Sequence, residues 1–166
     1  AIRGIYTAQI QYYLAEEVDS ITFEILDEKG DLINTFKGVK KQPKSDNDQP
    51  RWMRGGSSVP TTAKGLNSFN WDLRYPGATS FDGMIIWSGR PQVGPLAPTG
   101  DYQAKITVGE NSHTVSFKVV MDPNLTRITA SDVQAQFDLA MKIKNNTSIA
   151  NETVIAIRSI RTQLEE

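Results

Sequence analysis

Alternating apolar and polar positions predict β-strands through the first 120 residues of the chain. Residues 20–26 show the pattern most clearly, because large apolar side chains stand at every second position and would share one face of a strand. The turn-forming stretch 27–31, in which Gly30 can adopt a positive φ, connects this strand to an apolar partner at 32–36. The pattern therefore predicts an antiparallel hairpin.

Further strand character lies at residues 9–14, 67–73, 101–108 and 112–121. Phe69, Trp71 and Leu73 fall on one face of their strand, so we expect Trp71 in the core. No helical segment separates these strands, which favours an antiparallel β-sandwich over a parallel sheet. We place this sandwich at residues 1–122.

Two stretches without periodicity interrupt the strands, at about residues 38–64 and 76–98. The first exceeds the usual loop length, which is typical of either a functional or a mobile loop. Each stretch carries one tryptophan near arginines, Trp52 beside Arg54 and Trp87 near Arg90. Such aromatic side chains can close the end of a sandwich or dock on a neighbouring domain, or they can stack on sugar rings.

The pattern changes to a helical one in the last segment, residues 123–166. No glycine or proline occurs from Thr129 to Glu166, and Thr129 or Ser131 can cap a helix whose first turn carries Asp132. We expect one long helix of about 50 Å, with a helical hairpin bending near residues 144–148 as the alternative. The far half would need a returning helix or a second copy of the chain. The side chains expected to mediate this association are Phe137, Ile143, Val154, Ile157 and Leu164.

Composition narrows the possible functions without naming one. Of the 166 residues, 39% are hydrophobic and 22% charged, as in folded globular proteins, and the net charge of −1 gives no reason to expect nucleic-acid binding. No apolar run approaches the roughly 20 residues of a membrane-spanning helix. The absence of cysteine excludes thiol catalysis, zinc–thiolate sites and disulfides. The chain begins without methionine, so we read it as a mature product or an excised fragment.

Residues that could carry catalysis or bind a metal are sparse. His113 is the single histidine, and we expect it exposed on the outward side of its strand. Several acidic residues cluster in polar turns, where carboxylates stay solvated, whereas glycosidases need an opposed pair with one pKa raised by burial. Asp46 and Asp48 lack the glycine of an EF-type calcium loop. We therefore expect no catalytic residue, no metal site and no cofactor.

Three short motifs resemble the immunoglobulin-like module of the flagellar hook-capping protein and its relatives in bacterial exported proteins. The matching stretches are the hairpin from Asp27 and Gly30 to Phe36, the run 65–72 around Trp71, and Pro98-x-Gly100-x-Tyr102. The resemblance implies an immunoglobulin/fibronectin-III-like sandwich. After Asp72 the chain departs from that module, because Leu73-Arg74-Tyr75-Pro76-Gly77-Ala78 replaces a glycine-rich turn.

This variant, together with Gly94-Pro95 and the helical run 134–139, is similar to the C-terminal region of bacterial proteins with sortilin-like or BNR-repeat β-propellers, often labelled glycosyl-hydrolase-like. The resemblance implies export, a partner in an upstream β-propeller of the same parent chain, and hydrolytic activity, if any, in that propeller. We therefore expect a non-catalytic interaction module. A carbohydrate-binding module using Trp52, Trp87, Arg54 and Arg90 is the alternative, and an autonomous glycoside hydrolase is a more distant one.

Overall fold

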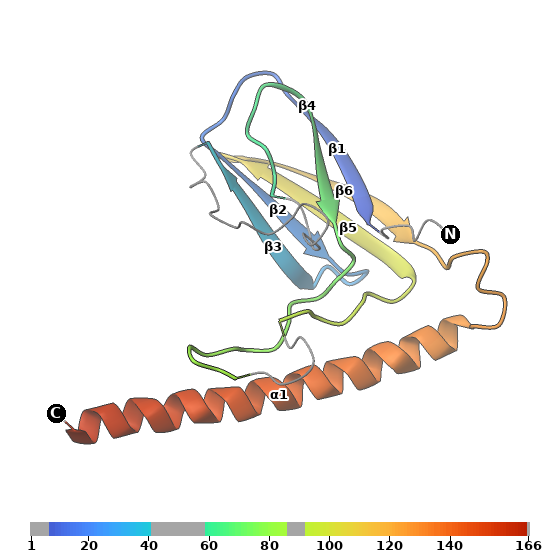
Figure 1. Ribbon diagram of the computed structural model, residues 1–166. Coiled ribbons are helices and arrows are strands. Elements are labelled where there is room, and N and C mark those ends of the chain that lie inside the picture. The colour runs from blue at the N-terminus through green and yellow to red at the C-terminus, as the bar shows by residue number, and fades with distance from the viewer. Residues whose placement is uncertain (1–6, 41–58, 86–91, 166) are drawn as a thin grey trace. The chain divides into compact units, whose positions relative to one another are not determined.

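The computed structural model describes residues 7–40, 59–85 and 92–165, which form two antiparallel sheets and one C-terminal helix (Figure 1). The prediction of a mainly β chain followed by a helix is confirmed. The chain separates into two compact units, one of residues 1–73 and 100–120 and the other of residues 74–99 and 121–166. The insert expected at residues 76–98 therefore groups with the helix and not with the sheets.

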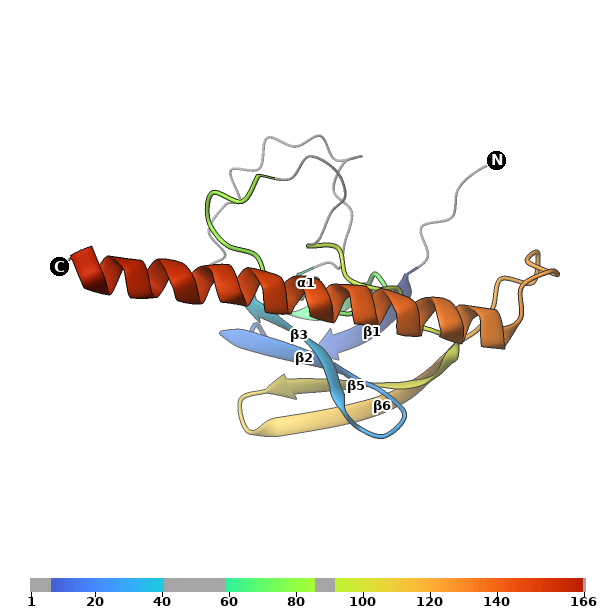
Figure 2. The ribbon, with the colours of Figure 1, turned by 90° about the horizontal axis from the view of Figure 1, so that it is seen from below.

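The first unit contains the six strands found in the described ranges. β1 (Ala8–Leu14) pairs antiparallel with β4 (Gly65–Trp71) in a two-stranded sheet. The four-stranded sheet has the order β3-β2-β5-β6 and is antiparallel throughout (Figures 1 and 2). Its strands are β2 (Ser20–Leu26), β3 (Leu32–Val39), β5 (Gly100–Val108) and β6 (Asn111–Val119).

The predicted hairpin between β2 and β3 is confirmed, and its turn is held by one side chain. Asp27 Oδ1 accepts hydrogen bonds from the backbone amides of Lys29 at 2.9 Å and Asp31 at 2.8 Å. Gly30 has a φ of 88°, a conformation that glycine adopts without the steric cost of a Cβ. The turn thus uses the local chemistry that its sequence indicates.

Aromatic rings from both sheets form the core of this unit. Trp71 is fully buried, as predicted, and its ring centroid lies 5.6 Å from that of Tyr102 and 6.1 Å from that of Phe117. Phe23 and Phe69, one from each sheet, stack at 4.7 Å. These contacts join the two sheets face to face, because alternate residues of each strand point to the same side.

Two expectations about side-chain direction were wrong. β4 ends at Trp71, and Leu73 has a φ of 57°, so Leu73 does not continue the inward face of the strand. His113 is exposed, but it pairs with Ile106 and therefore shares the side of Val115 and Phe117, not the outward side. It remains exposed because this end of β6 has little covering it: Val115 itself is 46% exposed.

The second unit is built around one uninterrupted helix, α1 (Ala130–Glu165), of 36 residues. Its length is about 54 Å at 1.5 Å per residue, and the hairpin alternative is excluded. Thr129 caps it: the Asp132 amide donates to Thr129 Oγ1 at 3.2 Å, while Asp132 Oδ2 accepts from the Thr129 amide at 2.9 Å and hydroxyl at 2.7 Å. This reciprocal capping satisfies amides that the first turn leaves without helical partners.

Candidate interaction surface

The insert before β5 forms a loop whose two ends are joined within the second unit. Arg74 and Leu96 form an isolated antiparallel bridge, the Tyr75 amide donates to Pro95 O at 2.9 Å, and Arg74 Nη1 donates to Gly94 O at 2.8 Å. The backbones approach so closely that a Cβ on Gly94 would lie 1.8 Å from Tyr75 O. Only glycine fits at position 94 without displacing the neighbouring backbone.

Thr79 anchors this loop to α1 through three of its own polar groups. Its amide donates to Ser148 Oγ at 3.0 Å, its carbonyl accepts from Asn151 Nδ2 at 2.6 Å, and its hydroxyl donates to Glu152 Oε1 at 2.9 Å. Positions 148, 151 and 152 lie on one side of a helix because they are three and four residues apart. We call these four residues the Thr79 anchor. Asn151 is the buried residue of α1.

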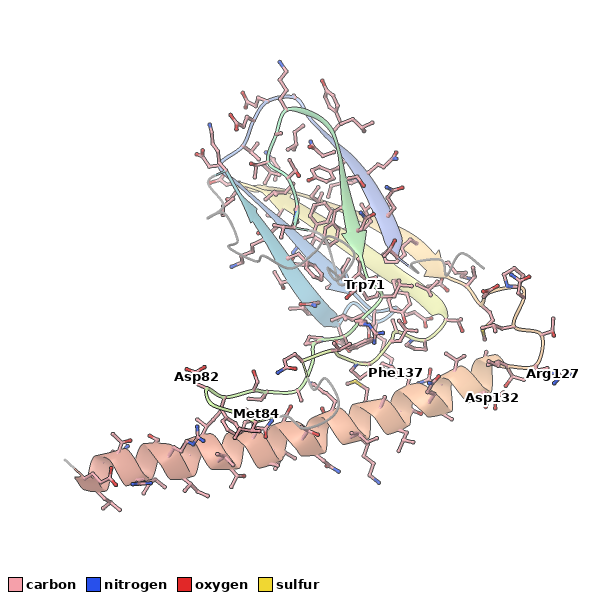
Figure 3. The ribbon with its side chains drawn as sticks, viewed as in Figure 1. Trp71, Asp82, Met84, Arg127, Asp132 and Phe137 are labelled. Carbon is pink, nitrogen blue, oxygen red and sulfur yellow. The ribbon has the colours of Figure 1, made fainter. Side chains whose placement is uncertain are left out.

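Contacts on either side of the Thr79 anchor extend the covered face of the helix. Nearer the N-terminus of α1, the ring of Tyr75 packs on that of Phe137, with 4.8 Å between the ring centroids (Figure 3). Nearer the C-terminus, Arg158 lies over the ring of Phe81 at 4.6 Å and donates to Asp82 O at 2.8 Å. From Phe137 to Arg158 the covered face is about 32 Å long at 1.5 Å per residue.

The opposite face of α1 carries a second apolar stripe that is exposed. It consists of eight positions spaced alternately by four and three residues, which we call the seam: Leu139, Ile143, Asn146, Ala150, Thr153, Ile157, Ile160 and Leu164. The five leucines and isoleucines in it are 57–82% exposed. At about 100° per residue, the seam lies roughly opposite the Thr79 anchor. The helix therefore carries apolar residues on two opposite faces, and one of these faces is exposed to solvent.

The five helix residues expected to mediate association differ in exposure. Phe137 and Val154 are half-buried, and Phe137 contacts Tyr75 within the unit. Ile143, Ile157 and Leu164 are exposed, at 58%, 60% and 82%. Sequence reasoning missed Leu139 and Asn146 as members of the same exposed stripe, although the alternating spacing of four and three residues was a sufficient signal.

The residues considered for sugar binding are not described by the structure. Trp52, Arg54, Trp87 and Arg90 all lie outside the described ranges, as do Asp46 and Asp48. In the described part of the chain, no three histidine, aspartate or glutamate side chains gather as a metal site would require. The same part contains no helix long and apolar enough to cross a membrane.

Three side chains in the described ranges have a pKa that is shifted by a structural cause. Burial raises the pKa of Tyr12, whose hydroxyl donates to Thr61 O at 2.7 Å and accepts from Thr61 N at 2.8 Å. The capping hydrogen bonds from Thr129 lower the pKa of Asp132. A hydrogen bond to Glu17 raises the pKa of Lys40. Each of these three shifts comes from a contact that stabilises local structure.

Comparisons with protein-family models, with curated proteins and with solved structures gave no match to this chain.

Proposed function

We propose that this chain is a non-catalytic interaction module, an immunoglobulin-like sandwich followed by a helix that presents an apolar face to a partner. The sheet order supports the immunoglobulin-like assignment. The order β3-β2-β5-β6 opposite β1-β4 corresponds to strands C′-C-F-G opposite B-E of that fold. On the resemblance of its motifs, we place the module at the C-terminus of an exported bacterial β-propeller protein.

The exposed seam of α1 is the observation that carries the proposal. Soluble proteins rarely leave several leucines and isoleucines exposed along one helix face unless another surface covers them. The covered face already uses aromatic, polar and cationic contacts to hold the loop of residues 74–99, so the seam is not needed for that packing. In the described part of the second unit this face stays exposed, so it is available to a partner.

A matched pair of substitutions tests whether the seam is free. Val154→Gln, at a half-buried position, should lower the free energy of unfolding of the second unit by about 1–2 kcal/mol, because it removes partly buried apolar surface. Ile157→Gln should change it by less than about 0.5 kcal/mol. Hydrogen exchange of α1 amides at high dilution measures both values. An equal loss for Ile157→Gln would mean that the seam is packed within the chain and would overturn the proposal.

Substrate panels test the non-catalytic part. Incubation with glycosides and polysaccharides should yield neither turnover nor binding. Turnover that one substitution abolishes would establish an enzyme. Binding without turnover that is lost in Trp52→Ala or Trp87→Ala, with folding intact, would establish a carbohydrate-binding module instead.

A further inference from the structure

The seam has the spacing of one particular kind of interface. Alternating steps of four and three residues, repeated from Leu139 to Leu164, give an average period of 3.5, which keeps a stripe facing a second helix wound around the first. In this heptad, Ile143, Ala150, Ile157 and Leu164 occupy the a positions, and Leu139, Asn146, Thr153 and Ile160 the d positions. The repeat covers about 38 Å of helix at 1.5 Å per residue.

We propose that the seam pairs with the seam of a second copy of this chain in a parallel, in-register coiled coil. This inference rests on the proposed function, and it identifies the partner of the exposed seam as a second copy of the chain. In a parallel pair each seam residue faces the same residue of the other copy. The apolar residues at both ends of the seam therefore contact apolar residues. The polar residues in the middle of the seam likewise face polar residues.

The size of the seam fits such a pair. A fully exposed leucine or isoleucine offers on the order of 100 Å² of apolar surface, so the five in the seam together with Ile149, which is 62% exposed and flanks it, offer roughly 400 Å² per helix. Two copies would bury roughly 800 Å² of apolar surface. Specific interfaces bury about 1,200–2,000 Å² in total, a little more than half of it apolar. The pair therefore lies in the lower part of that range, as a reversible dimer does.

The polar members of the seam select the orientation. Asn146 has a donor and an acceptor in its amide, and in a parallel pair it faces the same amide of the other copy, which supplies both partners. In an antiparallel pair that aligns the two seams, Asn146 faces Ile157 and its amide loses hydrogen bonds on burial. Thr153 tolerates burial, because its hydroxyl already donates to Ile149 O at 2.8 Å.

Charge does not oppose the parallel pair. The flanking cations are Lys142 at a g position and Arg161 at an e position. In a parallel coiled coil Lys142 faces Thr147 of the other copy, and Arg161 faces Ala156. No two like charges meet beside the seam, so pairing incurs no repulsion there.

Sedimentation equilibrium of the full chain tests whether it pairs with itself. We expect a monomer–dimer equilibrium with a dissociation constant on the order of 10 µM. Ile157→Asp should weaken it at least about 30-fold, because it introduces a charge into the apolar layer. Ser159→Asp adds the same charge two residues away, off the seam, and should change it less than about threefold. A chain that stays monomeric about tenfold above the expected constant overturns the inference.

Disulfide cross-linking tests the orientation. Because the chain has no native cysteine, an introduced cysteine can form a disulfide only with the introduced cysteine of another copy. In a parallel pair, Leu164→Cys alone and Leu139→Cys alone should each oxidise to a covalent dimer, while Ser159→Cys should not. If neither seam variant cross-links alone but their mixture does, the pair is antiparallel and the orientation is wrong. If the chain is monomeric and Ile157→Gln does not change the free energy of unfolding, self-pairing is refuted but the proposed function is not. If the chain is monomeric and Ile157→Gln lowers the free energy of unfolding, the proposed function is refuted as well.

Discussion

Asn151 gives the sharpest test of how the second unit is held together, because its buried amide serves a residue 72 positions earlier in the chain. In Asn151→Ala the Thr79 carbonyl loses a donor at 2.6 Å, and the weak contact of the same amide with Met84 Sδ at 3.9 Å also disappears. A partly buried carbonyl left without its partner costs about 1–3 kcal/mol. The loss should fall on the loop–helix contact, not on the strands.

The control is Asn145→Ala on the same helix. Asn145 is exposed, so its substitution changes only intrinsic helix propensity, which favours alanine over asparagine by a few tenths of a kcal/mol. That gain is common to both variants and cancels in their difference. The difference in the free energy of opening should therefore be about 1–3 kcal/mol, with Asn151→Ala the less stable.

Native-state hydrogen exchange at the Thr79 amide is the assay, because this amide donates to Ser148 Oγ and is freed when the loop leaves the helix. Its exchange should accelerate about 5- to 150-fold in Asn151→Ala relative to Asn145→Ala. Amides of β2 and β5 should exchange equally in the two variants. If the Thr79 amide exchanges at the same rate in both, the Asn151 side chain does not hold the loop.

Further predictions concern a backbone contact, a buried hydroxyl and the helix cap. Gly94→Ala should destabilise the second unit by about 2–4 kcal/mol in urea titrations, because its Cβ would overlap Tyr75 O. Tyr12→Phe should lower the free energy of unfolding by about 1–2 kcal/mol in chemical denaturation, because both backbone groups of Thr61 lose the hydroxyl. Because the folded pKa of Asp132 is lowered, its contribution is complete above the ordinary aspartate pKa of about 4 and disappears as pH falls through the folded value. Helix content followed by circular dichroism should accordingly fall between neutral pH and about pH 3 by more in the native chain than in Asp132→Asn.

Matched variants define what would contradict these predictions. Gly100→Ala adds a Cβ that meets only the Tyr102 ring at 3.9 Å, so a loss equal to that of Gly94→Ala would remove the steric explanation. Tyr13 is 69% exposed, and a cost for Tyr13→Phe as large as that for Tyr12→Phe would show that the Thr61 hydrogen bonds do not matter. Identical acid profiles for the native chain and Asp132→Asn would contradict the capping argument.

Features that depend on neighbouring residues could be read from the sequence. The Asp27 turn and the Thr129 cap rest on hydrogen bonds between residues at most four positions apart, and each formed where it was expected. The hairpin strands, whose alternation is a local pattern, also formed where they were expected. Trp71 was placed in the core by strand alternation alone. The unbroken helix follows from the absence of glycine and proline over its whole length.

The two expectations about side-chain direction failed for different reasons. Alternation alone does not say where a strand ends, and the left-handed backbone at Leu73 stops β4 two residues early. The side of His113 could have been read from its own strand, because His113, Val115 and Phe117 lie two residues apart and alternate positions share one face; its pairing with Ile106 on β5 agrees.

The surface of the helix shows the same division most plainly. By itself the sequence determined that α1 carries apolar residues at heptad spacing, and it grouped Phe137 with Ile157 as one association surface. Tertiary structure alone decided which residues are already covered, because Tyr75, Thr79 and Phe81 reach the helix from a loop more than 60 residues earlier. A helix has apolar positions on several sides, and only the element that packs against one side determines which other side is left for a partner.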